Sequence, residues 1–297
     1  MALPLIAHRF ANIDGLRLFY REAGPPDSTP LLLLHGFPSA SHQFRRVFDA
    51  LGTQFRLIAP DYPGFGYSDA PPSAADGGTF AYTFDRLSHI IELFCAQLGL
   101  SRFVLFAFDF GAPVGFRIAC RHPDWIAGVI VQNANAYDEG LSAIARNYVA
   151  LRRDAEGTSS TLGNLMTLDA TRGQYLQGVG NPEAIAPDGW TLDQCFLDRP
   201  GRRQIQVELA LDYHTNVALY PRWQAWLREH QPPLLILWGR NDPFFIEEGA
   251  HAYRRDVPSG EVHMFDSGHF ALEEYAPEMA PLIASFLRRI AIDARRP

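Results

Sequence analysis

Three residues with side chains suited to hydrolytic chemistry each follow a segment that is typical of a strand. Asp109, Asp242 and His269 occur in that order, each within a few residues of a predicted strand end. A carboxylate at such a place is expected outside the sheet, because burying an unpaired charge within it is unfavourable. Open α/β sheets bind ligands at the carboxyl ends of their strands. The spacing therefore predicts that two carboxylates and one imidazole meet at that edge.

Asp109 stands at the apex of a sharp turn. The apolar run 103–108 ends at this residue, and Gly111, Ala112 and Pro113 follow before a segment that is compatible with a helix. Small residues around a charged apex are typical of the nucleophile elbow, a strained strand-to-helix turn that exposes its central side chain. The alternative is an aspartate that only caps the helix, which is worth about 0.3–1 kcal/mol.

A carboxylate at this apex predicts attack on a saturated carbon. The usual pKa of aspartate is about 3.9, so Asp109 needs no base to be ionised at neutral pH. Carboxylate attack on an ester gives a product that reverts to the starting compounds. An epoxide has a strained ring and an alkyl halide has a good leaving group, so attack on either of them is productive. The expected intermediate is an alkyl-enzyme ester, which water must then hydrolyse.

His269 and Asp242 are suited to activating that water. A neutral imidazole can accept a proton from water near neutral pH. A neighbouring carboxylate fixes the tautomer of the imidazole and stabilises the imidazolium that forms. The alternatives are a structural histidine at position 269 and an Asx turn formed by Asp242 before Pro243.

Five motifs in this order give the chain a resemblance to a known superfamily. They are HGFP at 35–38, DYPGFGYSD at 61–69, FDFG at 108–111, GRNDPF at 239–244 and SGHF at 267–270. Together they resemble the α/β-hydrolases, and specifically the aspartate-nucleophile branch of epoxide hydrolases and haloalkane dehalogenases. The resemblance covers the whole chain and implies Asp109 as nucleophile, Asp242 as acid and His269 as base. It also implies an oxyanion hole formed by the backbone N–H groups of Phe37 and Phe110.

The position of the acid varies among such proteins. Some relatives carry it after the strand that precedes the insertion, where this chain has Asn133 and Asn135. Neither asparagine can supply a charge, and the nearest acid there, Asp138, lies further on. The resemblance therefore favours Asp242.

The leaving group separates the two branches. Epoxide opening produces an alkoxide that needs a proton, and the resemblance implies a cap tyrosine as donor, with Tyr213 first and Tyr148 second. The alternative for each is a core tyrosine. Dehalogenases commonly bind halide with a tryptophan after the nucleophile, but that position holds Phe110, which has no side-chain N–H. A halide site stays an alternative, because three tryptophans lie in or near the insertion: Trp190, Trp223 and Trp226.

The strand pattern predicts an α/β sheet interrupted by a helical insertion, and the resemblance implies the α/β-hydrolase fold, with a mostly parallel sheet, helices on both faces and an inserted helical cap. Residues 8–22 favour a hairpin that turns at Asp14-Gly15. No strand-like run occurs from about 136 to 228, so we predict a core of residues 1–135 and 229–297 and a cap of residues 136–228. Further strands are predicted at 31–34, 55–59, 103–108, 126–131, 234–238 and 261–265, and helices at 39–51, 84–98, 247–256 and 279–292.

The composition argues against several classes of partner. The 297 residues carry a formal charge of −7 and no run rich in Lys and Arg, so we expect neither nucleic acid nor a membrane surface as a partner. Cys95, Cys120 and Cys195 suit neither a disulfide framework nor a metal site and are expected to be buried and free. The N-terminus lacks the features of a signal peptide, and no segment has ~18 uninterrupted apolar residues, so we expect a cytoplasmic protein.

The leading hypothesis is a hydrolase without metal or cofactor that opens small hydrophobic epoxides to diols, with water as co-substrate. Aromatic residues near the predicted strand ends, such as Phe37, Phe110 and Phe244, favour a largely apolar pocket. Hydrolytic dehalogenation by the same covalent route is the alternative within enzymes, and a ligand-binding protein on the same fold is the alternative outside them. The sequence leaves open the oligomeric state, a homodimer included, and whether the bond before Pro38 is cis.

Overall fold

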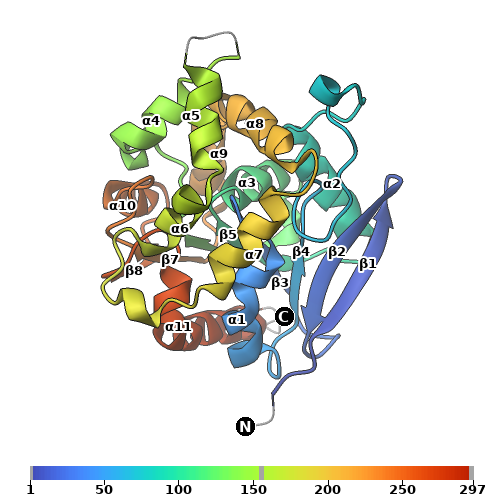
Figure 1. The fold of residues 1–297 in the computed structure, drawn as a ribbon. Coiled ribbons are helices and arrows are strands. Elements are labelled where there is room, and N and C mark those ends of the chain that lie inside the picture. Colours follow the sequence, from blue (N-terminus) through green and yellow to red (C-terminus); the bar gives the residue numbers. More distant parts are fainter. Residues whose placement is uncertain (1–2, 154–156, 294–297) are drawn as a thin grey trace.

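Eight strands form one central sheet in the computed structural model, which describes residues 3–153 and 157–293 (Figure 1). The strands are β1 (Ala7–Ile13), β2 (Leu16–Ala23), β3 (Leu31–Leu34), β4 (Leu57–Pro60), β5 (Phe103–Phe108), β6 (Ile126–Gln132), β7 (Leu234–Gly239) and β8 (Glu261–Phe265). Their order across the sheet is β1-β2-β4-β3-β5-β6-β7-β8. β2 is antiparallel to β1 and β4, and the other neighbours are parallel. The predicted mostly parallel sheet is confirmed.

Helices cover both faces of this sheet. They are α1 (Arg45–Leu51), α2 (Phe84–Gln97), α3 (Gly111–Arg121), α4 (Ala143–Val149), α5 (Thr158–Leu165), α6 (Leu168–Leu176), α7 (Asp188–Leu197), α8 (Arg202–Asp212), α9 (His214–His230), α10 (Glu247–Asp256) and α11 (Ala271–Asp293). Apolar side chains of α1 and α11 belong to the core on one face of the sheet, and those of α2, α3, α9 and α10 belong to the core on the other.

The central strands divide their side chains between these two cores. In β3, Leu31 and Leu33 pack with α1 and α11, whereas Leu32 and Leu34 pack into the core that contains α2 and α3. Successive side chains of a strand point to opposite faces, so a strand covered on both sides needs apolar residues at every position. This explains why β3 and β5 read as continuous apolar runs, and why the first polar residue after β5 marks the edge of the sheet.

Two predicted helices differ from the observed ones. The predicted helix 39–51 begins with a 3₁₀ turn (Ser41–Phe44) that leads into α1. The last helix begins earlier than predicted, at Ala271, and contains a non-helical residue, Tyr275, with φ −105° and ψ 19°. Pro277 accounts for this kink, because a proline ring clashes with the carbonyl four residues before it.

The inserted segment between β6 and β7 consists of helices joined by loops and contains no strand in its described residues, 136–153 and 157–228. Figure 1 shows α4, α5 and α8 at the top of the molecule, away from α1 and α11 at the bottom. Helix α9 runs through the predicted cap boundary at 228 and packs against α3 and α10. The boundary itself stays a prediction. In the described part of the chain, none of the helices has both the length and the apolar character needed to cross a bilayer.

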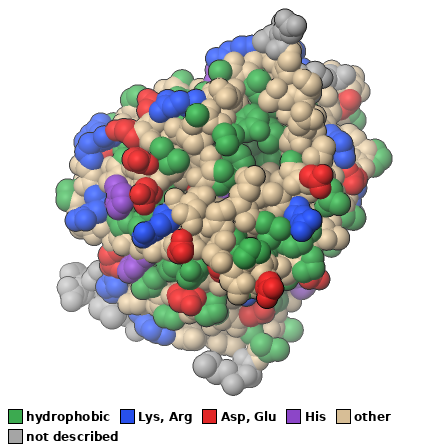
Figure 2. Space-filling view, turned by 60° about the vertical axis from the view of Figure 1, so that its left-hand side comes forward, with side chains coloured by type: hydrophobic (Ala, Val, Ile, Leu, Met, Phe, Trp, Pro, Cys, Tyr) green, Lys and Arg blue, Asp and Glu red, His purple; other side chains and the backbone are tan. Residues whose placement is uncertain are grey.

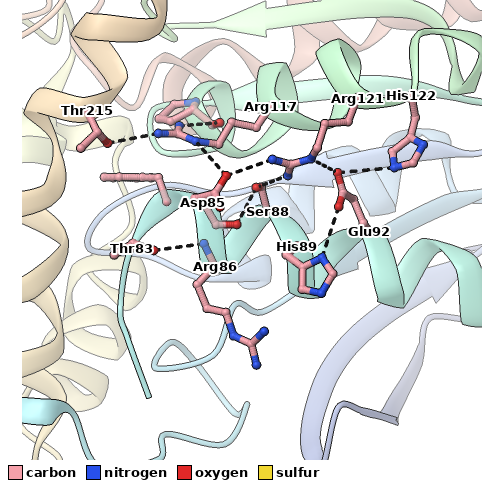
Figure 3. Close-up of polar contacts among 12 residues, drawn as sticks. Thr83, Asp85, Arg86, Ser88, His89, Glu92, Arg117, Arg121, His122 and Thr215 are labelled. Carbon is pink, nitrogen blue, oxygen red and sulfur yellow. Dashed lines mark hydrogen bonds and ion pairs between the residues drawn. The ribbon is translucent and has the colours of Figure 1, made fainter. Parts of the chain in front are cut away.

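A buried arginine ties the segment around α9 to the core. Arg117 of α3 donates to Asn216 Oδ1 at 2.7 Å and to Thr215 Oγ1 at 3.1 Å, and its guanidinium lies 3.9 Å from Asp85 of α2. Figure 3 shows Arg117 between Thr215 and Asp85. The backbone N–H of Phe84 also donates to Asp212 Oδ2 at 2.8 Å. These contacts fix the junction of α8 and α9 over the amino end of α2.

A second buried group ties α7 to the core. Asp193 accepts a hydrogen bond from the Tyr175 hydroxyl at 2.5 Å, and its other carboxylate oxygen lies 2.9 Å from His42 Nε2. The Tyr175 ring stacks on Phe270, with ring centroids 4.0 Å apart. Because Phe270 directly follows His269, this group connects the inserted helices to the predicted site.

Candidate active site

The turn between β5 and α3 presents Asp109 at the carboxyl end of the central strands. Its φ is +48°, in the left-handed region that residues with a side chain rarely adopt. A Cβ at Gly111 would lie 2.2 Å from the carbonyl oxygen of Leu34, and one at Gly36 would lie 2.3 Å from Asp109 Cβ. Only glycine fits at these two positions, so β3 and the turn pack closely around the carboxylate.

Two backbone N–H groups act on the Asp109 carboxylate. The N–H of Phe37 donates to Asp109 Oδ1 at 2.7 Å, and the N–H of Phe110 lies close enough to this carboxylate to lower its pKa. Phe37 lies in the loop after β3, and the Phe37–Pro38 bond is cis. Burial raises the pKa of Asp109 above its usual range, whereas His269 and the two N–H groups act to lower it. The two N–H groups predicted as an oxyanion hole therefore converge on one point.

His269 lies between the two carboxylates. Its Nδ1 is 2.7 Å from Asp242 Oδ2, and its Nε2 is 3.7 Å from Asp109 Oδ2. When Nδ1–H donates to Asp242, Nε2 carries no proton and forms no hydrogen bond with the Asp109 carboxylate, which is also an acceptor, so Nε2 can accept a proton from water. Burial alone would lower the pKa of His269, but the carboxylates of Asp242 and then Asp109 raise it above its usual value. The structure brings these three predicted residues together.

Two amide side chains at the carboxyl end of β6 hydrogen-bond Asp242 and the backbone of His269. This role was not predicted from the sequence. Asn133 Nδ2 donates to Asp242 Oδ2 at 2.8 Å, and Asn133 Oδ1 accepts from the Gly239 N–H at 2.9 Å. Gln132 Nε2 donates to Asn133 Oδ1 at 2.7 Å and to the His269 carbonyl at 3.1 Å. Their position at the carboxyl end of the strand next to β7 could have indicated this role, because uncharged partners of an acid can lie there.

Asp109 and His269 line one cavity beneath the inserted helices. The cavity has about 700 Å³ of empty space, its open mouth included. The other lining residues are Phe37, Phe110, Ala145, Tyr148, Leu165, Met166, Gln174, Gln206, Ala210, Tyr213, Phe244 and Phe245. A mainly apolar wall with a few polar groups is typical of sites for small organic ligands. On the face shown in Figure 2, hydrophobic side chains gather near the upper centre, with acidic and basic side chains interspersed around them.

Both tyrosines that the sequence singled out line this cavity. Tyr213 follows α8, and its ring lies 5.7 Å from that of Phe84 and 6.0 Å from that of Phe110 between centroids. Burial raises the pKa of Tyr213 well above its usual range, and the nearby Tyr220 acts in the same direction. Tyr148 of α4 is half-buried, and burial raises its pKa as well. Both hydroxyls therefore keep their protons at neutral pH.

The three tryptophans considered for halide binding pack elsewhere. Trp223 and Trp226 lie against Phe116 of α3, and Trp190 lies against Tyr175 of α6. None of them lines the cavity in the described part of the chain. Among the described residues, the cavity wall therefore has no indole N–H that could bind an anion.

Metal ligands and cysteines do not contribute to the site. Within residues 3–153 and 157–293, no three His, Cys, Asp or Glu side chains converge so that they could hold a metal ion. Cys95 is buried as predicted, Cys120 is half-buried and Cys195 is exposed. The prediction that all three are buried was wrong, because Cys195 lies on the outer face of α7 between the buried residues Gln194 and Phe196.

The chain is similar to known hydrolases over most of its length. Residues 29–276 match the family described as alpha/beta hydrolase fold. The chain is 40% identical over 279 residues to a haloalkane dehalogenase of Psychrobacter cryohalolentis, which covers 92% of this chain and 88% of that protein. It is 38% identical over 283 residues to an uncharacterized hydrolase, YNR064C, of Saccharomyces cerevisiae, with coverage of 94% and 96%. It is 27% identical over 282 residues to epoxide hydrolase 2 of Caenorhabditis elegans, with coverage of 92% and 77%.

Proposed function

The chain belongs to the α/β-hydrolase family, and we propose that it opens small hydrophobic epoxides to diols through a covalent ester on Asp109. The observation that carries this proposal is the lining of one apolar cavity by Asp109, His269, Tyr213 and Tyr148. These side chains supply the nucleophile, the base and the proton donors that epoxide hydrolysis requires. Epoxide and water are the only reactants, so the scheme needs no cofactor.

In the first step, a carboxylate oxygen of Asp109 attacks one carbon of the oxirane ring. A new C–O bond forms to that carbon while its bond to the ring oxygen breaks. Tyr213, with Tyr148 as the second donor, gives a proton to the ring oxygen, because a free alkoxide would be strongly disfavoured in an apolar cavity. The products of this step are an alkyl ester on Asp109 and a tyrosinate.

In the second step, His269 Nε2 takes a proton from a water molecule, and the resulting hydroxide attacks the ester carbon of Asp109. The N–H groups of Phe37 and Phe110 stabilise the oxyanion, an effect worth about 10²–10³ in rate for each donor. The bond from the ester carbon to the alkyl oxygen breaks, and the imidazolium protonates that oxygen to release the diol. Asp109 then ionises, and its proton restores the tyrosine, so epoxide and water are converted to diol alone.

Dehalogenation is the second candidate, since the relative that is 40% identical carries that name. It would use the same attack by Asp109, but the departing halide would need N–H donors around it. Phe110 follows the nucleophile, and no tryptophan among the described residues lines the cavity. The two tyrosines suit an oxygen leaving group better, and this favours the epoxide.

A paired assay with an aryl epoxide and a bromoalkane tests the proposal. We expect diol formation from the epoxide at a rate well above halide release from the bromoalkane, and loss of both activities in Asp109→Ala. Faster release of halide would assign the dehalogenase reaction instead. Stable binding of both compounds without turnover would favour a ligand-binding protein on this fold.

Isotope labelling separates covalent from direct hydrolysis. In a single turnover in heavy-oxygen water, the covalent route places the label in the Asp109 carboxylate, because water attacks the ester carbon. The first diol released then carries only unlabelled oxygen. A labelled diol in that first turnover would rule out the alkyl-enzyme ester.

A further inference from the structure

Two amide side chains stand in the otherwise apolar wall formed by the inserted helices. Gln174 of α6 is 5% exposed and Gln206 of α8 is 3% exposed, and both line the cavity. Gln174 Nε2 and Gln206 Oε1 are buried and have no hydrogen-bond partner. A buried polar atom without a partner is unfavourable, and few such atoms occur in native proteins. Their position on the cavity wall suggests that a ligand supplies the missing partners.

The chemistry of the wall restricts what that ligand can carry. Apart from Asp109 and His269, its described residues are neutral, with no arginine among them. A carboxylate or phosphate on the ligand would therefore have no counter-charge. A hydroxyl group both donates and accepts, so it can accept from Gln174 Nε2 or donate to Gln206 Oε1. The missing partner is thus a neutral group that can donate and accept, of which a hydroxyl is the simplest, rather than an ion.

The helix geometry sets the distance of this group from the reaction. Gln206 and Ala210 of α8 and Tyr213, which caps its carboxyl end in a helical conformation, all line the cavity at intervals of four and three residues. Residues at such intervals share one face of a helix. Seven residues at ~1.5 Å each place the backbone of Gln206 about 10 Å along the axis from that of Tyr213. Since Tyr213 is the proposed donor to the ring oxygen, this backbone spacing directs Gln206 to the far end of a bound epoxide.

We propose that Gln174 and Gln206 form a polar subsite for a neutral hydroxyl group, which the substrate carries about 10 Å from its oxirane oxygen. This inference rests on the proposed function, because Tyr213 and Asp109 place the oxirane. It changes the substrate class from plain hydrocarbon epoxides to epoxides that bear a distal hydroxyl. An extended chain advances about 3.4 Å per three bonds, so roughly eight or nine bonds separate the two oxygens.

Two substrates of equal length test the subsite. In 7,8-epoxyoctan-1-ol, about eight bonds separate the oxygens, and 1,2-epoxynonane replaces its hydroxyl with a methyl group. A wholly apolar cavity would favour 1,2-epoxynonane, since burying an unpaired hydroxyl is unfavourable. We expect the wild type to prefer the hydroxy epoxide in kcat/KM by about tenfold, the effect of one or two hydrogen bonds.

Leucine variants assign this preference to the amides. Gln206→Leu and Gln174→Leu should each reduce or reverse the preference, because kcat/KM for the hydroxy epoxide falls relative to that for 1,2-epoxynonane. Gln204→Leu is the matched control, because Gln204 is on the same helix but bonds Glu208 and does not line the cavity. Neither cavity variant should lower Tm, since each removes a buried polar atom that has no partner.

Binding of the products separates this inference from the proposed reaction. Calorimetry on the wild type and the same variants compares octane-1,2,8-triol with nonane-1,2-diol. Tighter binding of the triol that depends on both amides would support the subsite even if neither epoxide is hydrolysed. A wild-type preference for 1,2-epoxynonane, a ratio unchanged by both cavity variants, or a lower Tm in both of them would overturn the subsite.

Discussion

Protonation of His35 should destabilise the protein in mild acid. His35 is 0% exposed and lies in the loop that presents the Phe37 N–H. Its Nε2 accepts a hydrogen bond from the Tyr62 N–H at 3.2 Å, and its Nδ1 lies 3.2 Å from the Gly36 carbonyl oxygen, to which Nδ1–H can donate. A proton on Nε2 would remove the acceptor. Burial lowers the pKa of His35 to about 4, with the nearby Asp61 carboxylate opposing this in part.

The size of the effect follows from the difference between the folded and unfolded pKa values. An unfolded histidine has a pKa of about 6.5, so the unfolded chain binds the proton first as pH falls. Stability is then lost progressively between about pH 6.5 and 4, and rises with pH across that window. With ~1.4 kcal/mol per pKa unit, His35 alone should reduce the free energy of unfolding by ~2 kcal/mol at about pH 5 and ~3 kcal/mol at about pH 4.

Urea denaturation of the wild type and His35→Gln at several pH values between about 7.5 and 4.5 measures this contribution. The variant should be less stable at neutral pH, but the difference between the two proteins should shrink as pH falls. His251→Gln, at an exposed position, is the control and should leave the pH dependence unchanged. If the wild type and His35→Gln lost stability in parallel across this range, the argument from burial would be refuted.

Three further predictions concern the proposed reaction. His269→Gln should accumulate the ester on Asp109, seen as a mass increase of one substrate per chain, because general-base catalysis is worth about 10²–10⁴ in rate; full turnover without this adduct would contradict it. The acid limb of the kcat profile should lie above pH ~6.5, since the carboxylates raise the pKa of His269, and Asp242→Asn should move that limb to lower pH while reducing kcat. An unmoved limb would show that another group titrates. Tyr213→Phe should slow epoxide opening by about 10²-fold or more but leave bromoalkane turnover nearly unchanged, whereas equal losses would mean that Tyr213 does not act as the proton donor.

Much of the core could be read from the sequence because its strands are buried on both faces. The residues of β5 had to be apolar at every position, so Asp109 stood out where the run ended. The same reasoning located Asp242 and His269 after β7 and β8. Asn133 was judged only by its lack of charge, since its bond to Asp242 depends on how β6 and β7 lie beside each other.

The inserted helices were less predictable. Helical periodicity shows which residues share a face, but it does not show what that face meets. The presence of Tyr148 and Tyr213 in one cavity depends on contacts between distant parts of the chain, such as those of Arg117 with Thr215 and Asn216. No local sequence pattern predicts such contacts.

The sequence by itself determined the reactive groups, their order and the sheet that carries them, because buried strands and a sharp turn restrict residue type locally. Only the tertiary structure decided which side chains of the inserted helices face those groups. Gln174 and Gln206 show this, since a glutamine in a helix gives no signal in the sequence until packing buries one of its polar atoms without a partner.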